Sequence, residues 1–195
     1  MEDSVYRGGN GHGPEPEPDP EEQAATDADS QPEAGASAEH PLSWSALQTL
    51  GQYLEDDGWH PTAVEGKHAY RTYYSGRNGE MRCYAQILID LEQFVFYVVA
   101  MLKVPEDARV AAAEYITRAN YGLRIGNLEM DFSDGEVRFK GSVDFEGLEL
   151  SPQLIRNTVY PAVQTMDRYL PGLLKVAFGG KTPVEAIAEV EGRKS

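Results

Sequence analysis

The sequence predicts an α+β domain, in which a mainly antiparallel five-stranded sheet carries helices on one face. After residue 41, several short runs alternate apolar and polar residues with a strand period, and others repeat apolar residues with a helical period. Tight turn signals join neighbouring strand-like runs, which favours antiparallel pairing. The expected order of elements is α-β-β-β-α-β-β-α, followed by a short C-terminal helix.

The first helix is expected to begin at Ser43, a residue type that caps helix N-termini well, and to end at Gly58. Leucines at helical spacing would form its buried stripe. Three strands are expected next, over residues 68–74, 80–90 and 93–101. The first two are joined through Asn78-Gly79, a pair suited to a type I′ hairpin turn.

A second helix is expected over residues 104–122. Its apolar stripe would comprise Val110, Ala113, Ile116 and Thr117. Two further strands are expected over residues 123–132 and 136–145. Asp134-Gly135 marks the hairpin between them. Apolar and polar residues alternate cleanly in the second of these strands, so one of its faces should be buried and the other exposed to solvent.

The longest helix is expected to begin after Ser151, where a serine cap precedes a proline, and to end at Gly179-Gly180. Pro161 and Pro171 lie inside it. Because proline removes a backbone hydrogen bond, a kink near each proline, or a break at Pro171, is expected. A capping box that starts at Thr182 would open the last short helix.

Charge and composition divide the chain into two parts. Residues 1–40 are expected to form a disordered, acidic tail rich in proline and glycine, and residues 41–195 to form one folded domain. The tail carries 11 of the 32 acidic residues and one of the 17 basic residues, and thus −10 of the formal charge of −15. Both parts would repel a phosphate backbone, so nucleic acid is not an expected partner.

The cellular compartment is predicted from the cysteine content and the N-terminus. The single cysteine, Cys83, excludes an intramolecular disulfide and a cysteine-rich metal site, which favours a reducing compartment. The N-terminus is acidic and has no apolar stretch behind it, unlike a secretory signal. The longest apolar run, residues 94–102, is about half of a bilayer span. We therefore expect a cytoplasmic protein without membrane contact.

Some local strings are more specific than turn chemistry. The two most specific are Arg118-Ala119-Asn120-Tyr121-Gly122 and Gly126-Asn127-Leu128-Glu129-Met130. Together with Phe94-Val95-Phe96-Tyr97 and Asp167-Arg168-Tyr169-Leu170-Pro171-Gly172, they resemble the YbjN family of bacterial sensory transduction regulator-like domains. The resemblance covers roughly residues 43–190. It implies the fold of class I type III secretion chaperones, which usually form homodimers and bind protein segments, and it implies no catalytic residues.

The residues that could carry chemistry do not form a catalytic or metal-binding set. Four carboxylates surround one hairpin: Glu129, Asp131, Asp134 and Glu136. Oxygen ligands at a turn can bind a divalent cation, but this spacing is not that of an EF-hand, and a solvated turn is the expected role. Cys83 falls on the core face of its strand, as a buried and inert thiol. His68 lies at a strand start, where a structural role is expected and a role as metal ligand or base is the alternative. No cofactor or metal is expected.

The outer face of the sheet is the expected binding surface. If the apolar residues of each strand face the core, aromatic and basic side chains share the opposite face: Arg71, Tyr73, Arg82, Tyr84, Tyr97, Arg138 and Lys140. Aromatic residues and arginine are enriched at protein interfaces. The alternative is ordinary cross-strand pairing on a solvated face. A second subunit could also cover this surface.

The sequence therefore predicts a non-enzymatic protein-interaction domain, regulatory or chaperone-like, that forms a homodimer and binds an unidentified protein partner. The alternative is a small-molecule sensor, with a pocket between the sheet and the long helix near Trp59 and Tyr160. An enzyme ranks third, because no base–nucleophile pair is visible. The acidic tail could screen the basic sheet face in a salt-dependent way, so that its removal would raise partner affinity.

Overall fold

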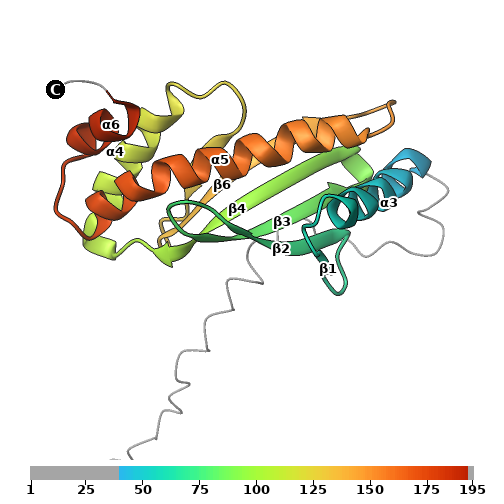
Figure 1. Ribbon diagram of the computed structural model, residues 1–195, viewed down its shortest axis with the longest axis horizontal. Helices are drawn as coiled ribbons and strands as arrows, with labels where there is room; N and C mark the ends of the chain where they lie inside the picture. The colour runs from blue at the N-terminus through green and yellow to red at the C-terminus, as the bar shows by residue number, and fades with distance from the viewer. Residues whose placement is uncertain (1–39, 193–195) are drawn as a thin grey trace, which may run out of the picture. The chain divides into compact units, whose positions relative to one another are not determined.

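The structure, a computed structural model, describes residues 40–192, and the expected disordered tail lies outside these residues apart from His40. Figure 1 shows the helices and the sheet. The helices are α3 (Pro41–Asp56), α4 (Arg109–Asn120), α5 (Pro152–Ala177) and α6 (Pro183–Glu191). The strands are β1 (Thr62–Ala63), β2 (Ala69–Ser75), β3 (Glu80–Leu88), β4 (Gln93–Lys103), β5 (Asn127–Met130) and β6 (Glu136–Asp144). Two 3₁₀ turns are η2 (Ile89–Leu91) and η3 (Glu106–Ala108).

The sheet has six strands in the order β1-β2-β3-β4-β6-β5, and every neighbouring pair is antiparallel. The α+β class and the antiparallel sheet are confirmed, whereas the expected number of five strands is wrong. The additional strand is β1, whose residues Thr62 and Ala63 pair with Arg71 and Tyr70 of β2. Two residues are too few for a strand period to show in a sequence.

One face of the sheet forms the core together with the helices. Alternate residues of β3 are buried on this face: Met81, Cys83, Ala85 and Ile87. They belong to one apolar cluster with the buried residues of α3, α4, α5 and α6. The long helix α5 lies along this face and contacts β4 and β6 (Figure 1). The helices therefore cover one face of the sheet, as the sequence predicts.

The N-terminus of α3 differs from the expected one. The helix begins at Pro41, and Ser43 is not its N-cap. Proline is favoured in the first turn because it has no N–H group that needs a partner there. The Ser43 hydroxyl is buried instead and donates to the Ile89 carbonyl oxygen at 2.8 Å. A buried carbonyl of the η2 turn thus receives the hydrogen bond that it needs.

The stripe that α4 buries also differs from the expected one. Val110 is 77% exposed, and Thr117 faces solvent as well. The buried residues are Ala112, Tyr115, Ile116 and Ala119. The residues expected to form the first turn of the helix form η3 instead, so the α-helix begins only at Arg109. Tyr115 then faces the core, where its hydroxyl donates to the Tyr169 carbonyl oxygen of α5 at 2.8 Å.

The helix α5 continues through both of its internal prolines, so of the two expected alternatives, a kink or a break at Pro171, the break is wrong. Pro161 and Pro171 each remove one backbone hydrogen bond. Burial of one whole side of the helix against the sheet and its neighbouring helices offsets that loss. The Ser151 cap and the capping box that starts at Thr182 both form as expected.

The β2–β3 connection is not a type I′ turn. Neither Asn78 nor Gly79 has the positive φ angle that such a turn requires. The turn is bound to α5 instead, because the Asn78 backbone N–H donates to Asp167 Oδ1 at 2.8 Å. A tertiary contact therefore decides the conformation of this hairpin.

Candidate functional site

The strand register places all seven predicted binding residues on the face of the sheet that is opposite to the core. They occupy two adjacent cross-strand rows. One row runs through Arg71, Tyr84, Tyr97 and Lys140. The next row runs through Tyr73, Arg82, Val99 and Arg138. We call these two rows the outer-face rows. The structure thus brings residues from four strands together in one continuous surface.

Glu129 on β5 extends the second row; the sequence indicated it only as a carboxylate of the hairpin and not as part of the binding surface. It pairs with Arg138 at 2.6 Å and with Lys140 at 2.9 Å. Partial burial alone would raise the pKa of Glu129, but hydrogen bonds from Lys140 and Arg138 outweigh it and lower this pKa. Glu129 is therefore an ionised counter-charge for two of the four basic side chains. The alternation of residues along the strand could be seen in the sequence. The pairing of Glu129 with Arg138 and Lys140 could not be predicted without the strand register.

Aromatic rings lie beneath or beside the basic groups of the rows. The Arg138 guanidinium is 4.5 Å from the centroid of the Tyr97 ring, and the Arg82 guanidinium is 5.7 Å from that of Tyr84. Tyr73 is 60% exposed, whereas the other six predicted residues are partly buried. Such stacking fixes the planes of the guanidinium groups, which prepares them for directional hydrogen bonding.

The edges of the sheet are less available than its outer face. On β5, the Asn120 side-chain amide donates to the Leu128 carbonyl oxygen at 2.8 Å and accepts from the Leu128 backbone N–H at 2.8 Å. An amide in this position occupies the hydrogen-bonding groups that an added strand would use. At the other edge, β1 is only two residues long. Strand addition is therefore a poor binding mode for this sheet, because short or blocked edges offer few backbone groups.

The space near Trp59 and Tyr160, where the sequence suggested a small-molecule pocket, is filled by aromatic rings. Trp59 is only 8% exposed. Its ring centroid lies 5.7 Å from that of Tyr74, 6.1 Å from that of Phe96 and 6.1 Å from that of Tyr160. These rings join α5 to the strands. Hollow spaces are found at the border of this aromatic cluster rather than between its rings.

Asp57, directly after α3, is the polar centre of this junction. Its Oδ2 accepts hydrogen bonds from Trp59 Nε1 at 3.0 Å, from the Tyr53 hydroxyl at 3.0 Å and from the Tyr160 hydroxyl at 2.8 Å. Partial burial would raise the pKa of Asp57, but these hydrogen bonds outweigh it and lower this pKa. Burial and the bond to Asp57 raise the pKa of Tyr53 to about 12. The carboxylate therefore stays ionised and joins α3 to α5.

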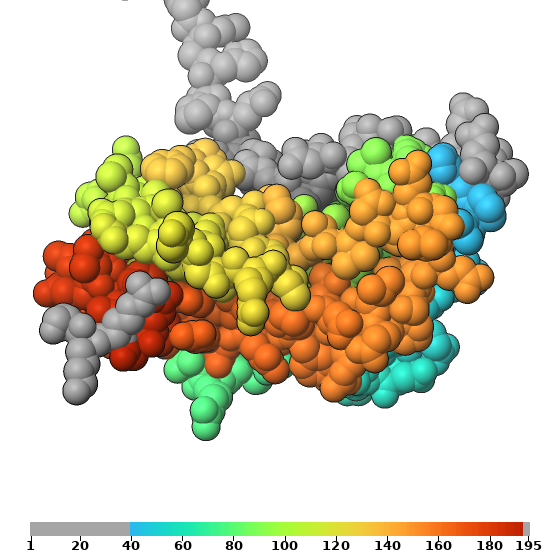
Figure 2. Space-filling model, turned by 90° about the horizontal axis from the view of Figure 1, so that it is seen from above, coloured from blue at the N-terminus to red at the C-terminus, as the bar shows by residue number. Residues whose placement is uncertain are grey.

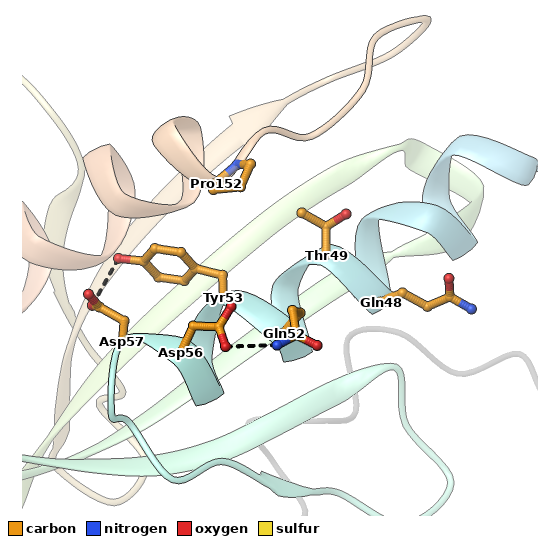
Figure 3. Close-up of a pocket in the computed structure, with 7 residues that line it drawn as sticks. All are labelled: Gln48, Thr49, Gln52, Tyr53, Asp56, Asp57 and Pro152. Carbon is orange, nitrogen blue, oxygen red and sulfur yellow. Dashed lines mark hydrogen bonds between the residues drawn. The ribbon is translucent and has the colours of Figure 1, made fainter.

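A groove of about 490 Å³ opens between α3 and the start of α5 (Figure 3). Side chains of α3 form most of its lining, together with Asp57 and Pro152. Figure 3 shows Tyr53 directed toward Asp57, and Gln52 donating to Asp56 at 2.8 Å. The groove lies in the range of volumes that small ligands occupy. It borders the aromatic junction rather than lying between the rings.

The remaining chemical candidates have structural partners. Cys83 is buried, and burial raises the pKa of its thiol far above its usual value. The His68 ring packs edge-on against Trp44, with centroids 4.9 Å apart. Asp134 pairs with Lys103 at 2.7 Å. Within residues 40–192, no group of three or more His, Cys, Asp or Glu side chains is placed to hold a metal ion.

A family model identifies the family of this chain. The family model YbjN, described as "putative bacterial sensory transduction regulator", matches residues 46–175. A solved structure described as YbjN, "a putative transcription regulator from E. coli", is 17% identical to this chain. That match covers 62% of this chain and 85% of the other, with a TM-score of 0.48. No curated protein matches the chain. Among the helices of residues 40–192, none combines the length and apolarity needed to cross a membrane. The matched region spans most of the domain, and the chain belongs to the YbjN family.

Proposed function

We propose that this chain is a non-enzymatic regulatory domain that binds a protein partner through the outer-face rows. The observation that carries the proposal is the pair of adjacent rows that gather three arginines, one lysine and three tyrosines across four strands. Within residues 40–192, the buried sides of the helices belong to the opposite face. Arginine and tyrosine are over-represented among the residues that contribute most to protein–protein affinity. The family description, a bacterial sensory transduction regulator, supports a regulatory role.

The edges of the sheet and its outer face together indicate how a partner segment would bind. Because the Asn120 amide occupies the β5 edge, the partner segment would lie across the strands rather than extend the sheet. Tyr73 would supply buried aromatic area, and the basic groups of the rows, of which Arg138 and Lys140 already pair with Glu129, would add charge-assisted hydrogen bonds to carboxylates. Binding would thus combine apolar burial with charge pairing and involve no covalent step. A partner segment with acidic and apolar side chains fits this surface.

The assembly and the location are part of the same proposal. The family resemblance implies a type III secretion chaperone-like fold, and we propose that residues 41–195 act as the binding unit of a cytoplasmic homodimer. Light scattering measures the mass directly: a homodimer has twice the chain mass of 21.5 kDa. A mass of one chain at micromolar concentration would reject the dimer and leave the binding face untouched.

Photo-crosslinking in the native cell tests the binding face. A photo-reactive phenylalanine analogue in place of Tyr73, which is 60% exposed on the outer face, should capture a specific protein. The matched control is the same analogue in place of Tyr121, which is 93% exposed in the turn after α4. Tyr73→Ala should then weaken binding of the captured protein by about tenfold or more, whereas Tyr121→Ala should not change it.

Equal capture at positions 73 and 121, or unchanged affinity in the Tyr73→Ala variant, would contradict the proposal. Circular dichroism and a melting curve establish that both variants are folded before affinities are compared. Because both tyrosines are exposed, neither substitution should change the free energy of unfolding by more than about 0.5 kcal/mol.

The second candidate function is a small-molecule sensor, which the groove beside α3 favours. It has a ligand-sized volume of about 490 Å³ and offers amide, hydroxyl and carboxylate groups. A thermal-shift screen of metabolites and divalent ions should raise the melting temperature if one of them binds. A ligand whose effect disappears in Gln52→Ala, but remains in Tyr73→Ala, would support the sensor and separate it from partner binding.

A further inference from the structure

A second hollow lies on the helix-covered side of the protein, where the β2–β3 turn meets α5. In Figure 2 the green turn projects beside the orange helix. The hollow has a volume of about 500 Å³. Ser75 at the end of β2 and Arg77 in the turn line it from one side, and Gln164 and Arg168 line it from α5. Two segments far apart in the sequence therefore each contribute one arginine together with other polar side chains.

Hydrogen bonds fix the geometry of this hollow. The Asn78 backbone N–H donates to Asp167 Oδ1 at 2.8 Å, and the Asn78 side-chain amide donates to the Asp167 carbonyl oxygen at 2.9 Å. Gly76 packs so closely against α5 that a Cβ atom there would lie 2.7 Å from Asp167 Cγ. The turn is thus held on the helix before any ligand arrives, which lowers the entropic cost of binding.

The charges in the hollow favour an anion. Asp167 is its one carboxylate, and both of its side-chain oxygens accept hydrogen bonds from Asn78. Among residues 40–192, neither Arg77 nor Arg168 forms an ion pair. The Arg168 guanidinium lies 5.4 Å from the centroid of the Tyr169 ring. Two arginines therefore line a hollow whose one carboxylate already accepts hydrogen bonds from Asn78.

We propose that this hollow binds the anionic group, phosphate or carboxylate, of a small ligand. Guanidinium groups match the geometry of both oxyanions and can donate two parallel hydrogen bonds. The Ser75 hydroxyl and the Gln164 amide supply further donors. The chain as a whole has a formal charge of −15 and repels anions at long range, so binding here depends on these local donors. The site is separate from the outer-face rows and does not depend on partner binding there.

Nuclear magnetic resonance of the full chain tests the site with two probes, inorganic phosphate and citrate, at constant ionic strength. At least one probe should give saturable shifts in the amides of residues 75–79 and 164–168. Arg77→Ala and Arg168→Ala should each weaken its binding about tenfold, because each removes a charge-assisted contact. Arg124→Ala, which removes an exposed arginine outside the hollow, is the matched control and should bind as the original chain does.

The identity of the probe that saturates distinguishes the two sources of the anionic group. Saturation by phosphate alone assigns a phosphorylated ligand, and saturation by citrate alone assigns a carboxylate ligand. Shifts that rise linearly without saturation for both probes would overturn the proposal. Undiminished binding in the folded double variant R77A/R168A would overturn it as well. Neither result bears on crosslinking at Tyr73, so the two proposals fail independently.

Discussion

At the scale of single residues, the contact between Tyr115 and Gly172 shows how α4 and α5 pack together. The Tyr115 side chain is fully buried, and its hydroxyl donates to the Tyr169 carbonyl oxygen at 2.8 Å. Gly172 lies inside α5, and a Cβ atom there would lie 2.7 Å from Tyr115 Cζ. The glycine therefore provides the space that the tyrosine ring fills.

The substitution Gly172→Ala should destabilise the protein by about 1–3 kcal/mol, because the buried ring has no space to move into. In an open helix the same change would stabilise by about 1 kcal/mol, so the sign of the effect is diagnostic. Chemical denaturation measures the free energy of unfolding. Gly122→Ala is the control: its Cβ would meet no atom closer than 3.8 Å, and its stability should stay within about 0.5 kcal/mol. A Gly172→Ala variant as stable as the original chain would contradict this packing.

Several residue roles depend on contacts that a sequence does not display. Ser43 has the residue type of an N-cap, but its hydroxyl is used by a carbonyl that is 46 positions away. Val110 fits a helical stripe in the sequence, yet the buried side of α4 is the one that carries Tyr115, whose hydroxyl bonds to α5. By contrast, the burial of Cys83 followed from simple alternation in β3. Local pattern predicts the orientation of a strand residue better than the function of a polar side chain.

At the scale of elements, the junction of α3 with α5 depends on the Asp57 carboxylate. Three donors converge on its Oδ2, and the Arg156 guanidinium lies 3.7 Å from its Oδ1. Its lowered pKa means that the ionised form is favoured in the folded state. The stability that this group contributes is therefore present above the usual aspartate pKa of about 4, and it is lost as the pH falls below that value.

Asp57→Asn should lower the free energy of unfolding at pH 7 by about 1–3 kcal/mol, because the donors then meet a neutral acceptor. At pH 3 the difference from the original chain should become smaller, since Asp57 of the unfolded chain, with the usual pKa of about 4, is then mostly protonated. Urea denaturation at both pH values measures the two differences. Asp56→Asn is the matched control, because Asp56 is exposed and, within residues 40–192, its side chain accepts a hydrogen bond from Gln52 alone. A destabilisation that is equally large at pH 3 and pH 7 would show that charge is not the cause.

The strands and helices differ in how well the sequence predicts them. β2, β3, β4 and β6 have clear alternation or long apolar runs, and all four lie close to their expected ranges. β1 has only two residues, too few to show a period, and was not predicted. β5 was predicted over residues 123–132, but it is limited to Asn127–Met130. The continuity of α5 at Pro171 could not be predicted, because local preference favours a break and only tertiary burial reverses it.

At the scale of the whole molecule, the candidate surface was partly predictable. Alternation in four strands was sufficient to assign the seven outer-face residues to one side of the sheet. The pairing of Glu129 with Arg138 and Lys140 required the strand order, in which β5 follows β6 at the edge. The hollow at the β2–β3 turn required the packing of that turn on α5. Sites built from side chains of one sheet face can thus be inferred from sequence, whereas hollows between elements cannot.

The distribution of charge along the whole chain leads to a further prediction. Residues 1–40 hold −10 of the formal charge of −15, whereas the outer-face rows carry three arginines and one lysine. An acidic partner approaching these rows is repelled by the net charge of the chain. Removal of residues 1–40 should therefore raise the affinity for the protein captured at Tyr73, mainly through a faster association rate.

The salt dependence identifies the cause of this change. At about 10 mM salt the screening length is about 30 Å, and the chain without residues 1–40 should bind the partner severalfold more tightly than the full chain. At about 1 M salt the screening length is about 3 Å, and the two chains should bind the partner equally well. The control is a full-length chain in which the acidic residues of 1–40 are replaced by their amides. It should bind like the shortened chain, because charge rather than length is responsible. Equal affinity of the full and shortened chains at low salt would contradict the prediction, whereas a difference that persists at high salt would assign the effect to steric exclusion.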